Sequence, residues 1–170
     1  MDFVQISQNA LYALEDAEEA PTDLALKLDY RIKHLLVDEF QDTSPTQIKL
    51  IEQLTQGWMD DDGRTLFLVG DPMQSIYRFR KADVGLFIRV RQNGIGHIHP
   101  LPLRLYQNNR SVKNIVDWVN HTFADVFSEK DDATRGAVCF SPAVANKPLL
   151  NQAGVTIHPL ISGDRDPETE

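Results

Sequence analysis

The sequence predicts an α/β fold, and three observations support this class. Strand-length apolar runs alternate with stretches of helical periodicity. The run from Leu35 to Val37 is continuously apolar, which is typical of a strand buried on both faces of a parallel sheet. A second run, residues 65–69, ends in Gly70-Asp71-Pro72, a combination that breaks strands. Together these features predict a parallel sheet flanked by helices.

Helices and further strands are placed by periodicity and by capping signals. Ser44-Pro45-Thr46-Gln47 is the clearest helix start, because it combines a cap, a proline at the first position and a capping box. Asp83 and Gly94 are expected to bound another helix, and Ser111 to cap the longest one. The expected helices cover residues 2–19, 22–28, 44–57, 84–92 and 111–127, and the expected strands residues 31–37, 65–69, 98–105 and 155–161. The alternating leucines of residues 24–28 leave a strand open there.

Length and composition indicate an ordinary globular protein. The 170 residues fit one domain or slightly more, with a core that needs no cross-links. The single Cys139 excludes an internal disulfide and a cysteine metal cluster, which suits a reducing compartment. There is no apolar run of membrane-spanning length and no export signal in the sequence. These features predict a cytoplasmic protein without a membrane partner.

Charge is distributed unevenly along the chain. The net charge is −8, but the window from Arg78 to Lys113 holds eight basic residues and one acid, Asp83. A basic block inside an acidic chain indicates a phosphate-bearing partner.

Polar residues follow the two predicted buried strands. Asp38 and Glu39 come directly after the first strand, at the edge where α/β sheets bind ligands. One carboxylate can hold a hydrated Mg²⁺, and the other can orient or deprotonate a water for attack on a phosphate. Gln74 follows the second strand and can reach the same crevice. The alternative interpretation is a solvated acidic strand end.

Two further segments carry possible phosphate or nucleic-acid chemistry. Tyr77 and Phe79 interleave with basic residues, an arrangement in which aromatic faces stack bases and cations hold the backbone. The alternative places both rings in the core. Arg110 lies just before the helix expected to start at Ser111, where an arginine can meet a phosphate. A plain surface arginine is the alternative.

Three segments together resemble a known family. "LLVDEFQDTSPTQ", "LVGDPMQSIYRFRKAD" and "LYQNNRS" are similar to motifs II, III and IV of the superfamily 1, UvrD-like DNA helicases, in the same order. The sequences of these segments most resemble the RecB/AddA branch, the motor subunits of helicase-nucleases (exonuclease V beta-type). The resemblance covers roughly residues 2–165. It implies a RecA-like P-loop NTPase fold, ATP and Mg²⁺ as cofactors, and single-stranded and duplex DNA as partners. It also implies partner helicase-nuclease subunits and a role in recombination and repair.

The resemblance assigns roles to matching residues. Asp38 resembles the Mg²⁺ ligand, and Glu39 resembles the base that activates water for ATP hydrolysis. Gln74 resembles the γ-phosphate sensor. Arg110 resembles the arginine that neutralises γ-phosphate charge in the transition state.

Other matching residues concern coupling and DNA. Gln41 and Asp42 resemble residues that link the nucleotide site to neighbouring motifs. The residues that fall where relatives contact single-stranded DNA are Tyr77, Phe79, Arg80 and Lys81. Two positions depart from the family pattern. Asn109 replaces a tyrosine that stacks on adenine in many relatives, and Lys81 replaces a glycine.

One family motif does not occur in the sequence. No G-x-x-x-x-G-K-[ST] phosphate loop, the Walker A motif, is found. We therefore expect residues 1–105 to be the second half of a first RecA-like motor domain, and residues 106–170 to be motif IV and the start of a second. Such a slice of an ATP-dependent helicase is expected to be inactive alone. The alternatives are a non-enzymatic remnant that binds single-stranded DNA or docks on a partner motor, and a metal-dependent phosphatase.

Overall fold

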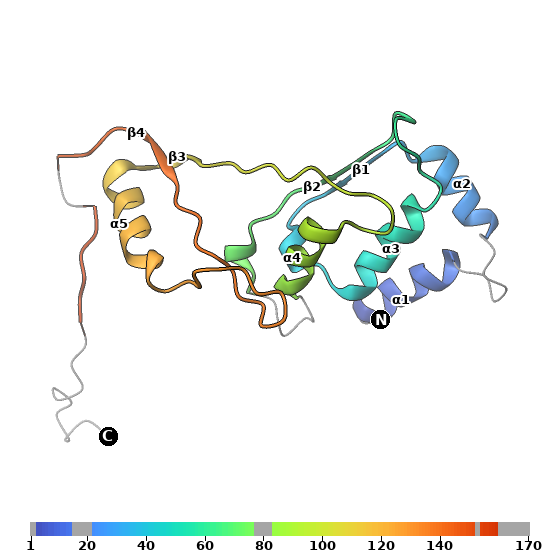
Figure 1. Cartoon of the computed structure of the whole chain (residues 1–170), viewed down its shortest axis with the longest axis horizontal. Helices are drawn as coiled ribbons and strands as arrows, with labels where there is room; N and C mark the ends of the chain where they lie inside the picture. The colour runs from blue at the N-terminus through green and yellow to red at the C-terminus, as the bar shows by residue number, and fades with distance from the viewer. Residues whose placement is uncertain (1–2, 15–21, 77–82, 152–153, 160–170) are drawn as a thin grey trace, which may run out of the picture. The chain divides into compact units, whose positions relative to one another are not determined.

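The computed structural model describes residues 3–14, 22–76, 83–151 and 154–159 (Figure 1). The chain forms two compact units. Unit 1 comprises residues 1–104 and 127–140, and unit 2 comprises residues 105–126 and 141–170. The assignment of residues 1–105 and 106–170 to parts of two motor domains stays a prediction. Among the described residues, no helix has the length and apolar character needed to cross a membrane.

Unit 1 is built around a parallel pair of strands. Its elements are α1 (Phe3–Leu14), α2 (Asp23–Arg31), β1 (His34–Val37), η1 (Phe40–Asp42), α3 (Pro45–Thr55), β2 (Thr65–Leu68), η2 (Pro72–Gln74) and α4 (Val84–Asn93). β1 pairs with β2 in parallel, with His34 opposite Thr65 and Val37 opposite Leu68. The crossover between the strands contains α3. This mixture of helices and parallel strands agrees with the predicted α/β class.

The β1–β2 pair buries one face. Leu35 and Leu66 point to the side where Phe40, Ile51 and Val90 form the core. Figure 1 shows α3 and α4 on this side of the strands.

The other face of the pair is exposed in the described structure. Leu36 is 69% exposed and Phe67 is 54% exposed. The prediction of burial on both faces is therefore wrong for the described residues. The physical reason is that successive side chains of a strand point to opposite faces, and in both strands the more buried residues alternate with exposed ones. The described helices that pack on the pair contribute their apolar side chains to one face.

The capping signals placed the unit 1 helices well. At the start of α3, Ser44 Oγ accepts from the backbone N–H of Gln47 at 3.4 Å. Gln47 Oε1 in turn accepts from the backbone N–H of Ser44 at 2.8 Å. α4 starts after Asp83, which accepts from the N–H of Gly85, and ends at Gly94 with φ 81°. The predictions of these two helices are confirmed.

The ends of the first helices and of β1 differ from expectation. Thr22 caps α2 as predicted, but the helix continues to Arg31, so the strand alternative there is excluded. Because α2 uses these residues, β1 begins at His34 rather than at residue 31. α1 covers Phe3–Leu14, and its expected end at residue 19 lies outside the described residues.

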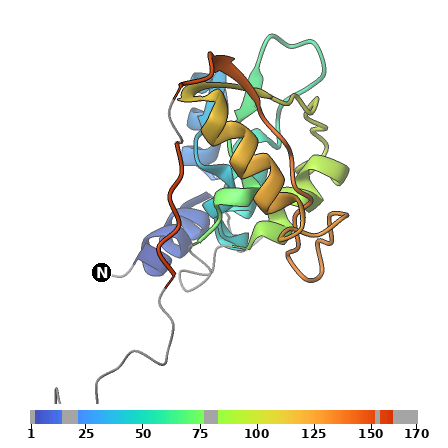
Figure 2. The ribbon, with the colours of Figure 1, turned by 90° about the vertical axis from the view of Figure 1, so that its left-hand side faces the viewer.

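Unit 2 holds a second parallel pair with one helix. Its elements are β3 (Gln107–Val112), α5 (Lys113–Ala124) and β4 (Val144–Lys147). β3 pairs with β4 in parallel, and α5 packs against both strands (Figure 2).

Several predictions for this region are wrong. Residues 101–106 form no strand, and Ile98 makes only an isolated bridge to Ile95. Pro100 and Pro102 lack N–H donors, which weakens any ladder there. Residues 155–159 are not a strand either, and β4 lies in a stretch that the sequence predicts as a loop. Ser111 belongs to β3, so α5 begins only at Lys113 and has no side-chain cap. The helix ends at Ala124 rather than at residue 127.

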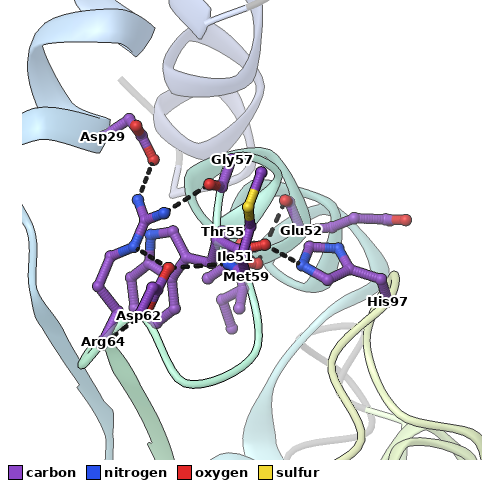
Figure 3. A network of polar contacts seen from close by, with 10 residues as sticks. Asp29, Ile51, Glu52, Thr55, Gly57, Met59, Asp62, Arg64 and His97 are labelled. Atoms are coloured by element: carbon purple, nitrogen blue, oxygen red, sulfur yellow. Dashed lines mark hydrogen bonds and ion pairs between the residues drawn. The ribbon is translucent and has the colours of Figure 1, made fainter.

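A polar cluster fixes the loop that enters β2 (Figure 3). Arg64 donates from Nη1 to Asp29 Oδ1 at 2.6 Å, from Nη2 to the carbonyl of Gly57 at 2.5 Å, and from Nε to Asp62 Oδ2 at 2.6 Å. Its guanidinium also lies 5.5 Å from the ring centre of Trp58. One side chain thus connects α2, the end of α3 and the loop before β2.

Ser44→Ala is expected to destabilise the fold by about 1 kcal/mol, since it removes the cap of α3. Urea unfolding followed by circular dichroism measures this change. Lys49→Ala, at an exposed position of the same helix, is the matched control. Equal unfolding midpoints for Ser44→Ala and the control would contradict the role of the cap.

Asp62 gives a pH-dependent prediction. Backbone N–H groups of Met59 and Arg64, aided by the Arg64 guanidinium, lower the pKa of Asp62 from 3.8 to about 2. The carboxylate therefore stabilises the fold above the pKa of the unfolded chain, and this contribution fades as pH falls through about 2. Asp62→Asn is expected to lower the melting temperature at pH 7 and at pH 5 equally. The difference from wild type should shrink below pH 3.8, which thermal unfolding across pH will check.

Candidate functional site

The carboxyl ends of β1 and β2 are joined beyond the strands by backbone hydrogen bonds. The N–H of Val69 donates to the carbonyl of Val37, and the N–H of Phe40 donates to the carbonyl of Val69, both at 2.8 Å. Gly70 follows in close contact, since a Cβ there would lie 2.6 Å from Gln41 Oε1. The two segments after the strands are therefore held side by side, and a side chain at position 70 would separate them.

Asp38 and Glu39 stand at this edge, and both are exposed. Asp38 Oδ1 accepts from the backbone N–H of Glu39 at 2.9 Å. Glu39 has φ 51° and ψ 42°, a left-handed conformation that is uncommon for a residue with a side chain. This turn buries the next residue, Phe40, while the Glu39 carboxylate stays at the exposed edge. The two acids are thus accessible to a ligand in solution.

The side chain of Gln41 bridges the two strand ends. It is 2% exposed. Its Nε2 donates to Glu39 Oε2 at 2.6 Å, and its Oε1 accepts from the N–H of Asp71 at 3.0 Å. Asp71 Oδ2 then accepts from Gln74 Nε2 at 2.8 Å. A continuous chain of hydrogen bonds therefore runs from Glu39 through Gln41 and Asp71 to Gln74.

Asp42 completes the turn after Glu39. Its Oδ2 accepts from Gln41 Nε2 at 3.5 Å. Burial and the nearby Glu39 carboxylate raise the pKa of Asp42, and the hydrogen bond from Gln41 opposes them. Thr43 Oγ1 donates to the carbonyl of Phe40 at 2.7 Å and closes the turn. The acidic turn is therefore tied together by its own side chains.

The structure brings most of the predicted residues of unit 1 to one edge. Those at the edge are Asp38, Glu39, Gln41, Asp42 and Gln74. The predicted DNA contacts Tyr77, Phe79, Arg80 and Lys81 lie outside the described residues.

Asp71, which holds both Gln41 and Gln74, was not among the residues predicted from the sequence. A signal for it exists, because Asp71-Pro72 has the form of a cap followed by proline, and Asp71 Oδ1 accepts from the N–H of Met73 at 3.0 Å.

Arg110 has a different local setting from the one predicted. It lies inside β3 of unit 2, exposed, and α5 begins three residues later at Lys113. Arg110 therefore still lies close to the start of this helix, but the N-cap residue of α5 is Val112 rather than Ser111 as expected. The backbone N–H of Arg110 donates to Asn108 Oδ1 at 3.0 Å, and its carbonyl accepts from Lys147 Nζ at 2.9 Å. These bonds fix the backbone of Arg110 and leave its guanidinium exposed.

The basic window is partly neutralised. Its ion pairs in the described residues include Arg89 with Asp83, Arg91 with Asp131, and Lys113 with Asp117. Positive charge at these positions is balanced within the fold, so the window is less basic than its sequence indicates.

The acids at the edge can bind a metal ion only together with further ligands, such as phosphates and water. No group of three or more His, Cys, Asp or Glu that could hold a metal exists in the part of the chain that the structure describes. His97, for example, bonds instead to the carbonyl of Trp58 at 2.8 Å. Mg²⁺ in nucleotide sites is bound by one or two carboxylates together with phosphates and water. Exposed Asp38 and Glu39 can supply that carboxylate share.

Comparisons with known proteins show which proteins this chain resembles. The curated relatives include proteins named as the AddA subunit of an ATP-dependent helicase/nuclease. The one from Desulfitobacterium hafniense (strain Y51) is 36% identical over 135 residues, which cover 76% of this chain and 10% of the relative. The one from Exiguobacterium sibiricum is 38% identical over 133 residues, with 76% and 11% covered. The chain thus spans about a tenth of the length of the curated relatives that it matches.

A family model settles the classification. The model described as the UvrD/REP helicase N-terminal domain matches residues 1–94, which include β1, β2 and the whole hydrogen-bonded edge. The resemblance that motifs II to IV indicate is confirmed. The chain belongs to the UvrD/REP helicase family.

Proposed function

We propose that this chain is part of the motor of an ATP-dependent DNA helicase of the RecB/AddA type. It supplies one side of the ATP site and part of the path for single-stranded DNA. The complete motor would couple ATP hydrolysis to translocation and duplex unwinding in recombination and repair, in the cytoplasm and together with partner helicase-nuclease subunits. Family membership and the names of the relatives support this proposal.

The chemistry follows from the two exposed acids. Asp38 would hold the Mg²⁺ of a bound Mg–ATP, and the ion would supply charge neutralisation at the phosphates. Glu39 would accept a proton from the water that attacks the γ-phosphorus, while the bond from this phosphorus to the leaving ADP breaks. Its carboxylate receives a hydrogen bond from Gln41 on Oε2 at 2.6 Å, which fixes its direction and leaves Oε1 for the water.

The hydrogen-bonded chain is the observation that carries the proposal. Gln74 senses the γ-phosphate, and its amide is linked through Asp71 and Gln41 to the proposed base. Ser75 Oγ also donates to the carbonyl of Gln41 at 3.4 Å, so the segment after Gln74 is held by the same residue. The residues proposed to contact DNA begin two positions further, at Tyr77. A change at the γ-phosphate can therefore reach the DNA segment through a short path.

Two features complete the proposal from outside this edge. Arg110 would neutralise transition-state charge in the complete motor, the role that its family resemblance implies, and its side chain is exposed. The isolated chain does not hydrolyse ATP, because a triphosphate without the amides and lysine of a phosphate loop loses its main cradle. A purely DNA-binding remnant has less support, since three basic residues of its window are paired with acids.

A chimera tests the ATP site. In the AddA relative from Desulfitobacterium hafniense, the matched segment is replaced by that of this chain. We expect DNA-stimulated ATP hydrolysis, and Glu39→Gln should lower kcat by about 10²–10⁴-fold, because the general base is lost. Asp60→Asn, in the exposed loop before β2, is the control. An inactive chimera, or Glu39→Gln at the parental rate, would contradict the proposal.

The bridge at Gln41 gives a separate prediction. Gln41→Glu keeps the shape of the side chain but replaces the donor to Glu39 with a like charge. In the chimera we expect kcat to fall about 10²-fold through misplacement of the base, with a small change in KM for ATP. Gln56→Glu, an exposed position at the end of α3, is the matched control. Steady-state kinetics decides, and an unchanged kcat would exclude a positioning role for Gln41.

A further inference from the structure

The path of the chain gives unit 1 an unusual component. After α5 the chain returns from unit 2 to unit 1 for residues 127–140, and then leaves again to form β4. We call residues 127–140 the strap. Two short connections, residues 125–126 and 141–143, join its ends to α5 and β4. The strap is therefore covalently tied to both main elements of unit 2 while it packs in unit 1.

The strap is a closed and ordered loop. The rings of Phe127 and Phe140 at its two ends lie with their centroids 5.8 Å apart. Asp132 and Ala137 exchange two backbone hydrogen bonds, at 2.8 and 2.9 Å. Asp132 Oδ1 also accepts from the N–H of Thr134 at 2.9 Å, inside the turn. The two ends of the strap are therefore close together, and its turn is closed by its own hydrogen bonds.

Asp131 anchors the strap to α4, beside which the strap lies in Figure 1. Its Oδ2 pairs with Nη2 of Arg91, and its Oδ1 accepts from the N–H of Cys139 at 2.9 Å. Both side chains of the ion pair are largely buried, with 18% of Asp131 and 25% of Arg91 exposed. Burial alone would raise the pKa of Asp131, but these bonds lower it, so the carboxylate is charged at neutral pH.

Other contacts also join the strap to α4, among them the approach of Gly136 to Val84, where an added Cβ would lie 3.1 Å from Cγ1. Arg89 Nη1 donates to the carbonyl of Ala133 at 3.3 Å. The same carbonyl lies so near α4 that a Cβ at Gly85 would be 2.3 Å from it. An open pocket of about 520 Å³ is lined by Gln92 of α4 and by strap residues that include Lys130. The ion pair of Arg91 with Asp131 thus acts together with these contacts in holding the strap against α4.

α4 is connected in turn to the catalytic edge. Phe87 of α4 packs on Phe40, with ring centroids 5.9 Å apart. Phe40 is the neighbour of Glu39 and bonds to Val69 across the strand ends. A series of contacts thus leads from the strap through α4 to the acidic turn, and a contiguous network of this kind can carry coupling.

We propose that Asp131 is a positioning residue, and that its pair with Arg91 makes the strap a mechanical link between unit 2 and α4. Loosening of unit 2 reaches α4 through this pair. The inference goes beyond the proposed function and does not depend on it, because the link is a property of the chain itself.

A cycle of variants tests the link by amide hydrogen exchange of the full chain. Val116→Ala and Val116→Gly loosen unit 2, since Val116 is a buried residue of α5. Faster exchange in α5 confirms that loosening. With Asp131 present, we expect the loosening of α5 to raise the amide exchange rate of α4 by about threefold or more, the threshold for coupled sites. In the Asp131→Asn background, we expect the same loosening to raise this rate by less than about 1.5-fold, the threshold for uncoupled sites.

Two further variants separate the link from general destabilisation. Arg91→Gln breaks the same pair from α4 and should abolish the α4 response as Asp131→Asn does. Asp117→Asn breaks the exposed pair with Lys113 inside α5 and should leave the response intact. An α4 response that persists without the Arg91–Asp131 pair, or that is absent with it, overturns the proposal.

Discussion

The candidate site depends above all on one buried amide. Gln41 offers a donor to the segment after β1 and an acceptor to the segment after β2, so both strand ends are held by one side chain. Because the amide is almost fully buried, losing either bond would leave a polar group without a partner, which is more costly than at a surface. Gly70 follows from the same constraint, since the approach of Gln41 leaves no room for a Cβ.

The strands themselves divide their apolar residues between two environments. One side of the β1–β2 pair carries the core with Phe40 and Ile51, and the other presents Leu36 and Phe67 to solvent in the described structure. Leu36 and Phe67 are direct neighbours across the two strands, so they form one contiguous exposed apolar surface, a feature typical of an interaction site. In the curated relatives, the matched segment is about a tenth of a much longer chain.

Local chemistry explains what the sequence could predict and what it could not. The capping residues Ser44 and Asp83 act on their own helices, so α3 and α4 were placed correctly. The acids after β1 were found because strand and motif are continuous in the chain. β3 and β4 were missed because Gln107–Val112 is mostly polar, Val144–Lys147 is short and half polar, and both become strands by pairing with each other. The bridging role of Asp71 depends on a partner thirty positions earlier, which periodicity does not reveal.

The return of the strap to unit 1 has a consequence for biosynthesis. Unit 1 is discontinuous in sequence, since it comprises residues 1–104 and 127–140. Residues 127–140 can therefore join it only after α5 has been synthesised. The ion pair of Arg91 with Asp131 closes a long loop, whose entropy cost must be met before that contact stabilises anything. Until then α4 lacks this anchor, although the residues of the acidic edge have all been synthesised. A chaperone that shields α4 would act in that interval.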